Sequence, residues 1–248
     1  MAGFKTHITV STACGVAYGW YGCTQMDLPM PGCALAGGLC SIGGMMPDLD
    51  SDSGVPARET ISFAAAFVPM LMFQRMANHG LTMEYMILAG APLYLFIRFG
   101  IGSLLKKVTV HRGMFHSIPA LLIASMVTFL ICDSGMTTVR LFKAGGVAIG
   151  FLSHLVLDEI WSVNVTATGP KLKKSFGTAL KFFSPSGGAN SAAYGLLILI
   201  SLLVFQDLQP ATAAPQMVRP QMIRPGITDE DDVPVQHVAR PRREAIYE

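Results

Sequence analysis

Long apolar blocks alternate with short polar stretches from residue 8 to residue 205 of the chain. The blocks are rich in Ala, Leu, Ile, Val, Phe and Met, and most have the length of a helix. Short turns with Gly, Pro or charged residues join them, so successive helices are expected to run antiparallel. The pattern predicts helices over residues 8–24, 33–46, 60–77, 81–105, 117–132, 139–160 and 190–205.

This order predicts an all-α fold, a polytopic membrane bundle of three helical hairpins plus a further C-terminal helix. A membrane span needs about 17–25 residues, so the first two helices are short for a crossing and are expected to be tilted, central or re-entrant. The second block is rich in glycine, which permits close helix packing in a membrane. We expect residues 1–209 to form one membrane-embedded domain.

Two other segments have different compositions. Residues 161–189 are polar and basic with interleaved aromatic residues, which leaves open an amphipathic helix on an anionic bilayer surface or a solvated loop. Residues 210–248 combine repeated prolines with mixed charge, and we expect a disordered tail. No small-x-small cleavage site stands out near the start, so the mature chain is expected to keep His7.

Composition supports the membrane assignment. The 248 residues are 51% hydrophobic and only 14% charged, whereas soluble domains are about 25% charged. The net charge of +2 is too small for a nucleic-acid footprint, so membrane lipids are the expected partners, and nothing indicates an oligomeric state. The five cysteines form no Cys-x-x-Cys pair, which favours small buried hydrophobes over disulfides or metal ligands.

Four short polar motifs separate the predicted hairpins. Each motif is followed by enough chain for two helices, one running out and one returning, so all four can lie on one face of the bundle. We therefore expect them to meet and to bind a divalent metal ion. The motifs are His7, the run Pro47-Asp48-Leu49-Asp50 with Asp52, the run His111 to His116, and the run Ser153 to Asp158.

Each motif also has a simpler interpretation. His154 and Asp158 lie four residues apart, on one face of a helix, where they suit zinc or hydrogen-bond each other. The acids from Asp48 to Asp52 resemble the start of a calcium loop, with Glu59 at its twelfth position, but the flanking helices fit a shared centre better. His7 alone is equally compatible with a buried or surface polar residue.

The third motif combines two histidines with an arginine at the start of a helix. His116 or Ser117 is expected to cap that helix, and Pro119 fits its first turn. Arg112 suits bidentate binding of a phosphate or carboxylate, or it anchors the topology by pairing with the acidic loop. His79 on the opposite face and His237 in the tail are not expected to take part.

Basic residues predict the orientation, because they accumulate in short cytoplasmic loops. The motif face carries more of them than the opposite face, which has Arg75, Arg140 and Lys143, so the motif face is expected in the cytoplasm. Its basic residues are Lys5, Arg58, Lys106, Lys107, Arg112, Lys171, Lys173, Lys174 and Lys181.

From His7 to about residue 185, these motifs resemble the LexA-regulated, membrane-bound, metal-dependent hydrolases of bacterial inner membranes. The most specific part is the run His111-Arg112-Gly113-x-x-His116-Ser117, although Met114-Phe115 stands where a smaller polar residue is expected. The resemblance implies a helical inner-membrane protein with a metal centre and hydrolase activity. The proline-rich tail lies outside it.

Together these features predict a metal-dependent hydrolase of a lipid or lipid-linked ester, preferably a phosphoester, at the cytoplasmic membrane surface. Zinc is the first choice, with manganese or magnesium as alternatives, in one or two ions that activate water and polarise the scissile bond. Asp52 is the expected general base or outer acceptor, and Arg112 stabilises developing negative charge. A metal transporter and a membrane protein with a structural metal are the other candidates. The expected ligands are His7, Asp48, Asp50, His111, His116, His154 and Asp158.

Overall fold

The structure is a computed structural model, and it describes residues 3–50, 55–101, 103, 114–166, 169–172, 177 and 180–209. This part of the chain contains α-helices, one 3₁₀-helix (η1), one π-helix (η2) and two short strands. In chain order they are α1 (Phe4–Gln25), α2 (Met30–Gly43), η1 (Met46–Asp50), α3 (Val55–Asn78), α4 (Met83–Leu95), η2 (Phe96–Ile101), α6 (Ile118–Ile131), α7 (Thr137–Ile160), β1 (Val163–Thr166), β2 (Gly169–Leu172) and α8 (Gly187–Leu208).

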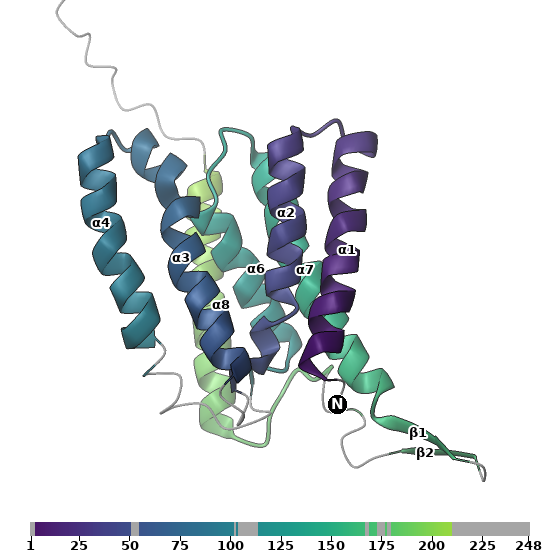
Figure 1. The fold of residues 1–248 in the computed structure, drawn as a ribbon. Coiled ribbons are helices and arrows are strands. Elements are labelled where there is room, and N and C mark those ends of the chain that lie inside the picture. The colour runs from purple at the N-terminus through teal and green to yellow at the C-terminus, as the bar shows by residue number, and fades with distance from the viewer. Residues whose placement is uncertain are drawn as a thin grey trace, which may run out of the picture. The chain divides into compact units, whose positions relative to one another are not determined.

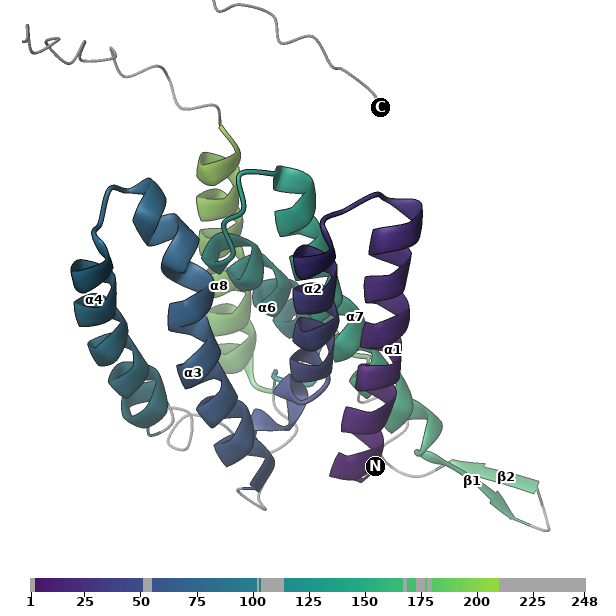
Figure 2. The ribbon, with the colours of Figure 1, turned by 45° about the horizontal axis from the view of Figure 1, so that its top comes forward.

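The helices pair as the sequence predicts. α1 and α2 form the first hairpin, α3 and α4 the second, and α6 and α7 the third, after which α8 packs against α6 (Figures 1 and 2). This arrangement confirms the all-α fold of three hairpins and a further helix. Ser117 accepts a hydrogen bond from the Ala120 amide, and Pro119 lies in the first turn of α6, as expected. Residues 210–248 lie outside the described residues.

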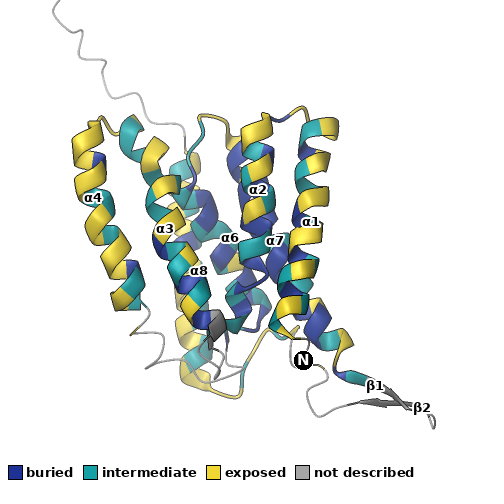
Figure 3. Ribbon diagram, in the orientation of Figure 1, coloured by how far each residue is buried: buried dark blue, intermediate teal, exposed yellow. Residues whose placement is uncertain are grey.

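Four helical segments are long and apolar enough to cross a membrane: Ala57–Asn78, Met83–Ile101, Thr137–Ile160 and Gly187–Leu208. In the most apolar 18-residue stretch of each span, 61% of the residues of α7 are buried within the protein. The corresponding share is 6% both for the span of α4 and η2 and for α8. Their exposed residues are visible in Figure 3. Because these outer helices present Leu, Ile, Phe and Tyr outward, they suit contact with lipid, while α7 is central.

Part of the basic segment 161–189 forms strands, which neither the amphipathic helix nor the solvated loop expected there includes. β1 and β2 pair antiparallel, with Val163 opposite Leu172 and Thr166 opposite Gly169. The β-branched residues of β1 favour an extended backbone, a local preference that the basic and aromatic pattern of residues 161–189 obscures. The strand pair therefore replaces both the amphipathic helix and the solvated loop over these residues.

Glycines allow the helices of the core to approach closely. A Cβ on Gly37 of α2 would lie 2.8 Å from the Gly15 carbonyl oxygen of α1. A Cβ on Gly150 of α7 would overlap the carbonyl oxygen of Cys40 in α2. α2 has only 14 residues, about 21 Å of helix, and it lies between α1 and α7. The short, glycine-rich second block is thus a central helix.

A charged cluster joins three helices at the end opposite the polar motifs. Asp207 of α8 accepts hydrogen bonds from the guanidinium groups of Arg75 in α3 and Arg140 in α7. Arg140 also donates to the carbonyl oxygen of Cys132 at 3.0 Å and lies over the Phe129 ring at 4.0 Å. The cluster therefore holds α3, α7 and α8 together at this end.

Replacing Asp207 by Asn should lower the free energy of unfolding by about 3 kcal/mol, because two partly buried arginines lose their shared acid. This value is at the lower end of the range for buried ion pairs, since the Arg75 side chain is 23% exposed. Thermal unfolding in detergent measures the effect. Glu84→Gln, at an exposed acid on the same side of the bundle, is the control, and an equal response of both variants would contradict the assignment.

Candidate metal centre

The described parts of all four polar motifs lie at one end of the bundle. His7 is in the first turn of α1, and Asp48 is in η1, just after α2. His116 precedes α6, and His154 and Asp158 occupy the last two turns of α7. This is the lower end of the bundle in Figure 1. The antiparallel hairpins therefore bring together residues that are up to 151 positions apart in the sequence.

Four side chains face one another closely. Oδ1 of Asp48 lies 3.5 Å from Nε2 of His154 and 3.8 Å from Nε2 of His116. Oδ2 of Asp158 lies 3.9 Å from each of the same two nitrogens. At a tetrahedral ion with bonds of about 2.0–2.2 Å, ligand atoms are about 3.3–3.6 Å apart. The four nitrogen–oxygen separations equal this spacing or exceed it by a few tenths of an ångström, so each pair has nearly the spacing of two atoms that share an ion.

His154 is held in one tautomer. Its Nδ1 lies 2.7 Å from the carbonyl oxygen of Gly44, and because a carbonyl only accepts, Nδ1 carries the proton. Nε2 is therefore the atom that faces Asp48 and Asp158. It is buried and has no hydrogen-bond partner among the described residues. A histidine that donates one N–H to a backbone carbonyl and presents its other nitrogen has the arrangement of a metal ligand.

His7 forms a second layer of the cluster. Its ring stacks on that of His154, with centroids 3.6 Å apart and planes 12° from parallel. Nε2 of His7 lies 3.3 Å from Oδ1 of Asp158. This is the other carboxylate oxygen from the Oδ2 that faces His116 and His154. The side chains thus form two overlapping sets, one with Asp48, His116 and His154 and another with His7, His154 and Asp158.

The cluster is withdrawn from solvent. His7, His116, His154 and Asp158 are all 2% exposed or less. Burial acts to raise the pKa of the Asp48 carboxyl, but hydrogen bonding to His116 and the nearby imidazoles outweigh it, so the net pKa lies below its usual value. Asp48 is therefore ionised at neutral pH.

The simpler interpretations fit this geometry less well. His154 and Asp158 do not hydrogen-bond each other through the facing atoms, because 3.9 Å is too long. Asp48 faces imidazole nitrogens, which suit zinc, whereas calcium prefers oxygen ligands. His7 is neither solvent-exposed nor isolated, since it contacts two members of the cluster.

Several predicted site residues stand apart from this account. Asp50 lies at the end of η1, and Asp52, His111 and Arg112 lie outside the described residues, as does His237. His79 is exposed in the turn after α3, at the other end of the bundle. The Gly44 carbonyl is the functional group that sequence reasoning missed. The Gly43-Gly44 pair indicates a close approach there, but no sequence pattern shows which carbonyl a histidine reaches.

Comparison with known proteins identifies the chain at the level of its family. Residues 1–213 match the family described as YdjM inner membrane protein, a region that contains the whole candidate centre. No curated protein and no solved structure matches significantly. The inner-membrane part of the resemblance seen in the sequence is thereby confirmed, while its hydrolase activity stays a prediction. With its four apolar helices of spanning length, the chain is a multi-pass protein that belongs to the bacterial YdjM inner membrane protein family.

Proposed function

We propose that the protein is a metal-dependent hydrolase that acts on a lipid or lipid-linked ester, preferably a phosphoester, at the cytoplasmic surface of the inner membrane. The observation that carries the proposal is the buried Nε2 of His154, which faces two carboxylates. If Nε2 is neutral, its lone pair points at the negatively charged oxygens of Asp48 and Asp158. If it is protonated, its buried N–H makes no hydrogen bond among the described residues. A cation between these groups removes both problems.

Asp48, His116, His154 and Asp158 would hold this ion. Two imidazoles and two carboxylates suit zinc, and manganese or magnesium are the alternatives. His7 would either orient Asp158 as an outer partner or hold a second ion together with Asp158 and His154. Metal stoichiometry distinguishes these roles, because His7→Ala halves the content of a two-ion centre but only weakens a one-ion centre.

A divalent ion here supplies a Lewis acid and an activated water. In the hydrolysis, the water oxygen joins the phosphorus or acyl carbon, and the leaving alcohol takes a proton. The buried side chains of the cluster would hold such an ion in a site withdrawn from bulk solvent. Asp52 as base and Arg112 as the group that stabilises negative charge remain proposals from the sequence alone.

The position of the cluster supports hydrolysis over transport. It lies at the ends of α1, α2, α6 and α7, whereas transport sites tend to lie near the bilayer midplane on broken helices. The sequence places more Lys and Arg at this end than at the other, and of these Lys5 and Arg58 are exposed, with Arg58 paired to Glu59. This asymmetry supports a cytoplasmic position for the cluster.

The direct test is hydrolysis by protein reconstituted in phospholipid vesicles, read by mass spectrometry of the released headgroup or fatty acid. Protein stripped of metal should be inactive, and zinc, manganese or magnesium should restore activity. His116→Ala should lower the rate at least about 100-fold, whereas His79→Ala should not change it. Inactivity of the metal-loaded protein toward phospholipids and lipid-linked phosphoesters would favour a structural metal, and metal uptake into sealed vesicles would favour transport.

A further inference from the structure

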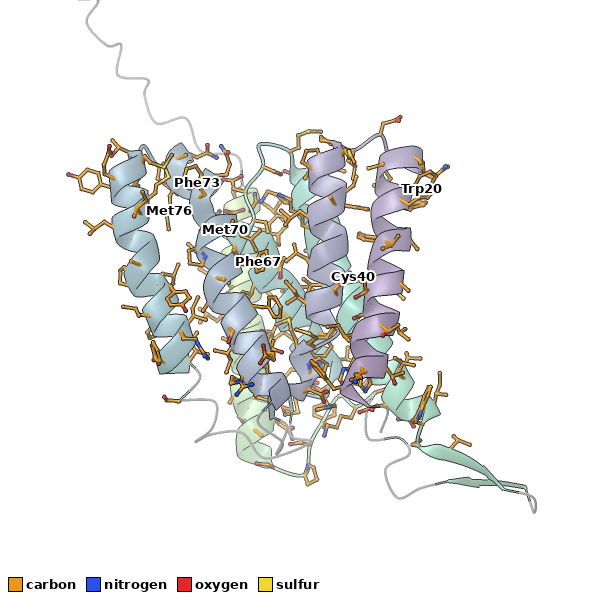
Figure 4. The ribbon with its side chains drawn as sticks, in the orientation of Figure 1. Trp20, Cys40, Phe67, Met70, Phe73 and Met76 are labelled. Carbon is orange, nitrogen blue, oxygen red and sulfur yellow. The ribbon has the colours of Figure 1, made fainter. Side chains whose placement is uncertain are left out.

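An apolar groove runs along the lipid-facing side of α2. It has a volume of about 240 Å³, room for about eight groups of water or methylene size. Phe67 projects from α3 toward α2 in Figure 4. The residues that form most of its walls are Leu35, Gly38 and Ile42 of α2, Met45 just after that helix, and Phe63 and Phe67 of α3.

The groove exists because α3 leans away from α2. α3 packs on η1, α4 and η2, and it has no extensive contact with α2. Gly38 deepens the gap, because a Cβ there would meet nothing within 4 Å. From Leu35 to Met45 the wall extends about 15 Å along α2, so the groove is long and narrow, and too small for another helix.

Two residues that line the groove directly follow residues of the candidate metal centre or its supporting backbone. Ile8 lines the groove and follows His7 in α1, and Met45 lines it and follows Gly44, whose carbonyl accepts the hydrogen bond from His154. Lys5 lies three residues before Ile8, on the same face of α1, and is exposed. Part of the groove wall therefore comes from chain next to the buried polar cluster and on the same helix face as an exposed cation.

We infer that this groove binds one acyl chain of an anionic phospholipid and thereby places its headgroup ester at the metal centre. The inference rests on the proposed function and names its substrate class. The apolar wall suits a hydrocarbon chain, the groove lies among helices that face lipid, and Lys5 complements a headgroup phosphate. Gly38 sets the depth of the groove and thus the length of chain accepted.

Photolabelling tests the inference without requiring turnover. The probe is phosphatidylglycerol with a diazirine near the end of one acyl chain, in phosphatidylcholine vesicles that contain the reconstituted protein. Labels should concentrate on residues 35–42 and 63–67. Gly38→Leu fills the groove and should lower this labelling about ten-fold or more, since several methylene contacts are lost. Gly195→Leu on α8, where a Cβ also meets nothing within 4 Å, should leave it unchanged.

Thermal unfolding of both variants checks that the fold is retained, and Gly38→Ala is the smaller replacement if Gly38→Leu unfolds. Labels spread equally over α4, α8 and the groove, or unaffected by Gly38→Leu, would overturn the inference. The same experiments separate it from the proposed hydrolase. Concentrated labelling without hydrolysis would retain the groove and reject the hydrolase. Hydrolysis of short-chain and long-chain phosphatidylglycerol with the same KM, unaltered by Gly38→Leu, would retain the hydrolase and reject the groove.

Discussion

Replacing His154 by alanine will abolish stoichiometric metal binding. His154 is common to both overlapping sets of candidate ligands, it stacks on His7, and its Nε2 faces both Asp48 and Asp158. Loss of an outer partner of a ligand typically lowers metal affinity 10–100-fold, and loss of this shared ligand should exceed that. Elemental analysis of the purified protein by mass spectrometry measures the metal content directly.

The same variant makes a prediction about stability. Metal that binds only the folded state stabilises it by about 2.7 kcal/mol at a concentration 100 times its Kd, so chelation should lower the unfolding temperature of the wild-type protein. His154→Ala should not respond to a chelator. Since neither protein then holds an ion, the unfolding temperature of metal-free wild-type protein should be close to that of His154→Ala and below that of the metal-loaded protein.

His79→Ala is the matched control, because His79 is exposed at the other end of the bundle and should keep wild-type metal content and chelator response. His154→Gln is a second variant, in which an amide replaces the imidazole at the buried position. Full metal content in both His154 variants would remove the proposed centre.

Replacing Gly150 by alanine should have the largest effect on stability. The new Cβ would overlap the Cys40 carbonyl oxygen and lie 2.9 Å from the Gly44 amide nitrogen. Both are backbone atoms of the α2 region, so no side chain can rotate away and the helices must separate. Overpacking costs about 1–3 kcal/mol and occasionally more, and we expect about 3 kcal/mol or more here, measured as unfolding in detergent.

The change should also reach the metal centre. Gly150 and His154 lie one turn apart on α7, on the same face, and that face contacts the end of α2 that carries Gly44. Moving α7 away would break the hydrogen bond from Nδ1 of His154 and lower metal affinity about 10–100-fold. Gly195→Ala on α8 is the control, and it should stabilise the helix slightly. Wild-type stability and metal affinity in Gly150→Ala would refute the close contact of α2 and α7.

The helical hairpins and the shared end of the polar motifs follow from the sequence alone. Apolar blocks of helical length must be buried in lipid or protein, and short turns force successive helices to run antiparallel. Motifs separated by two such helices therefore return to one end, which explains why His7, Asp48, His116, His154 and Asp158 can be grouped before any coordinates are known. The roles of Asp52, His111 and Arg112 remain predictions from the sequence.

Only the tertiary structure decided how these residues face one another. The stacking of His7 on His154, the hydrogen bond to the Gly44 carbonyl and the position of α2 between α1 and α7 depend on the rotation and separation of whole helices. Those quantities arise from backbone contacts at glycines distant in the sequence, such as Gly150 against Cys40, and a periodic pattern within one helix carries no information about its partner. The groove beside α2 has the same origin, because it is formed by the space that two helices leave between them.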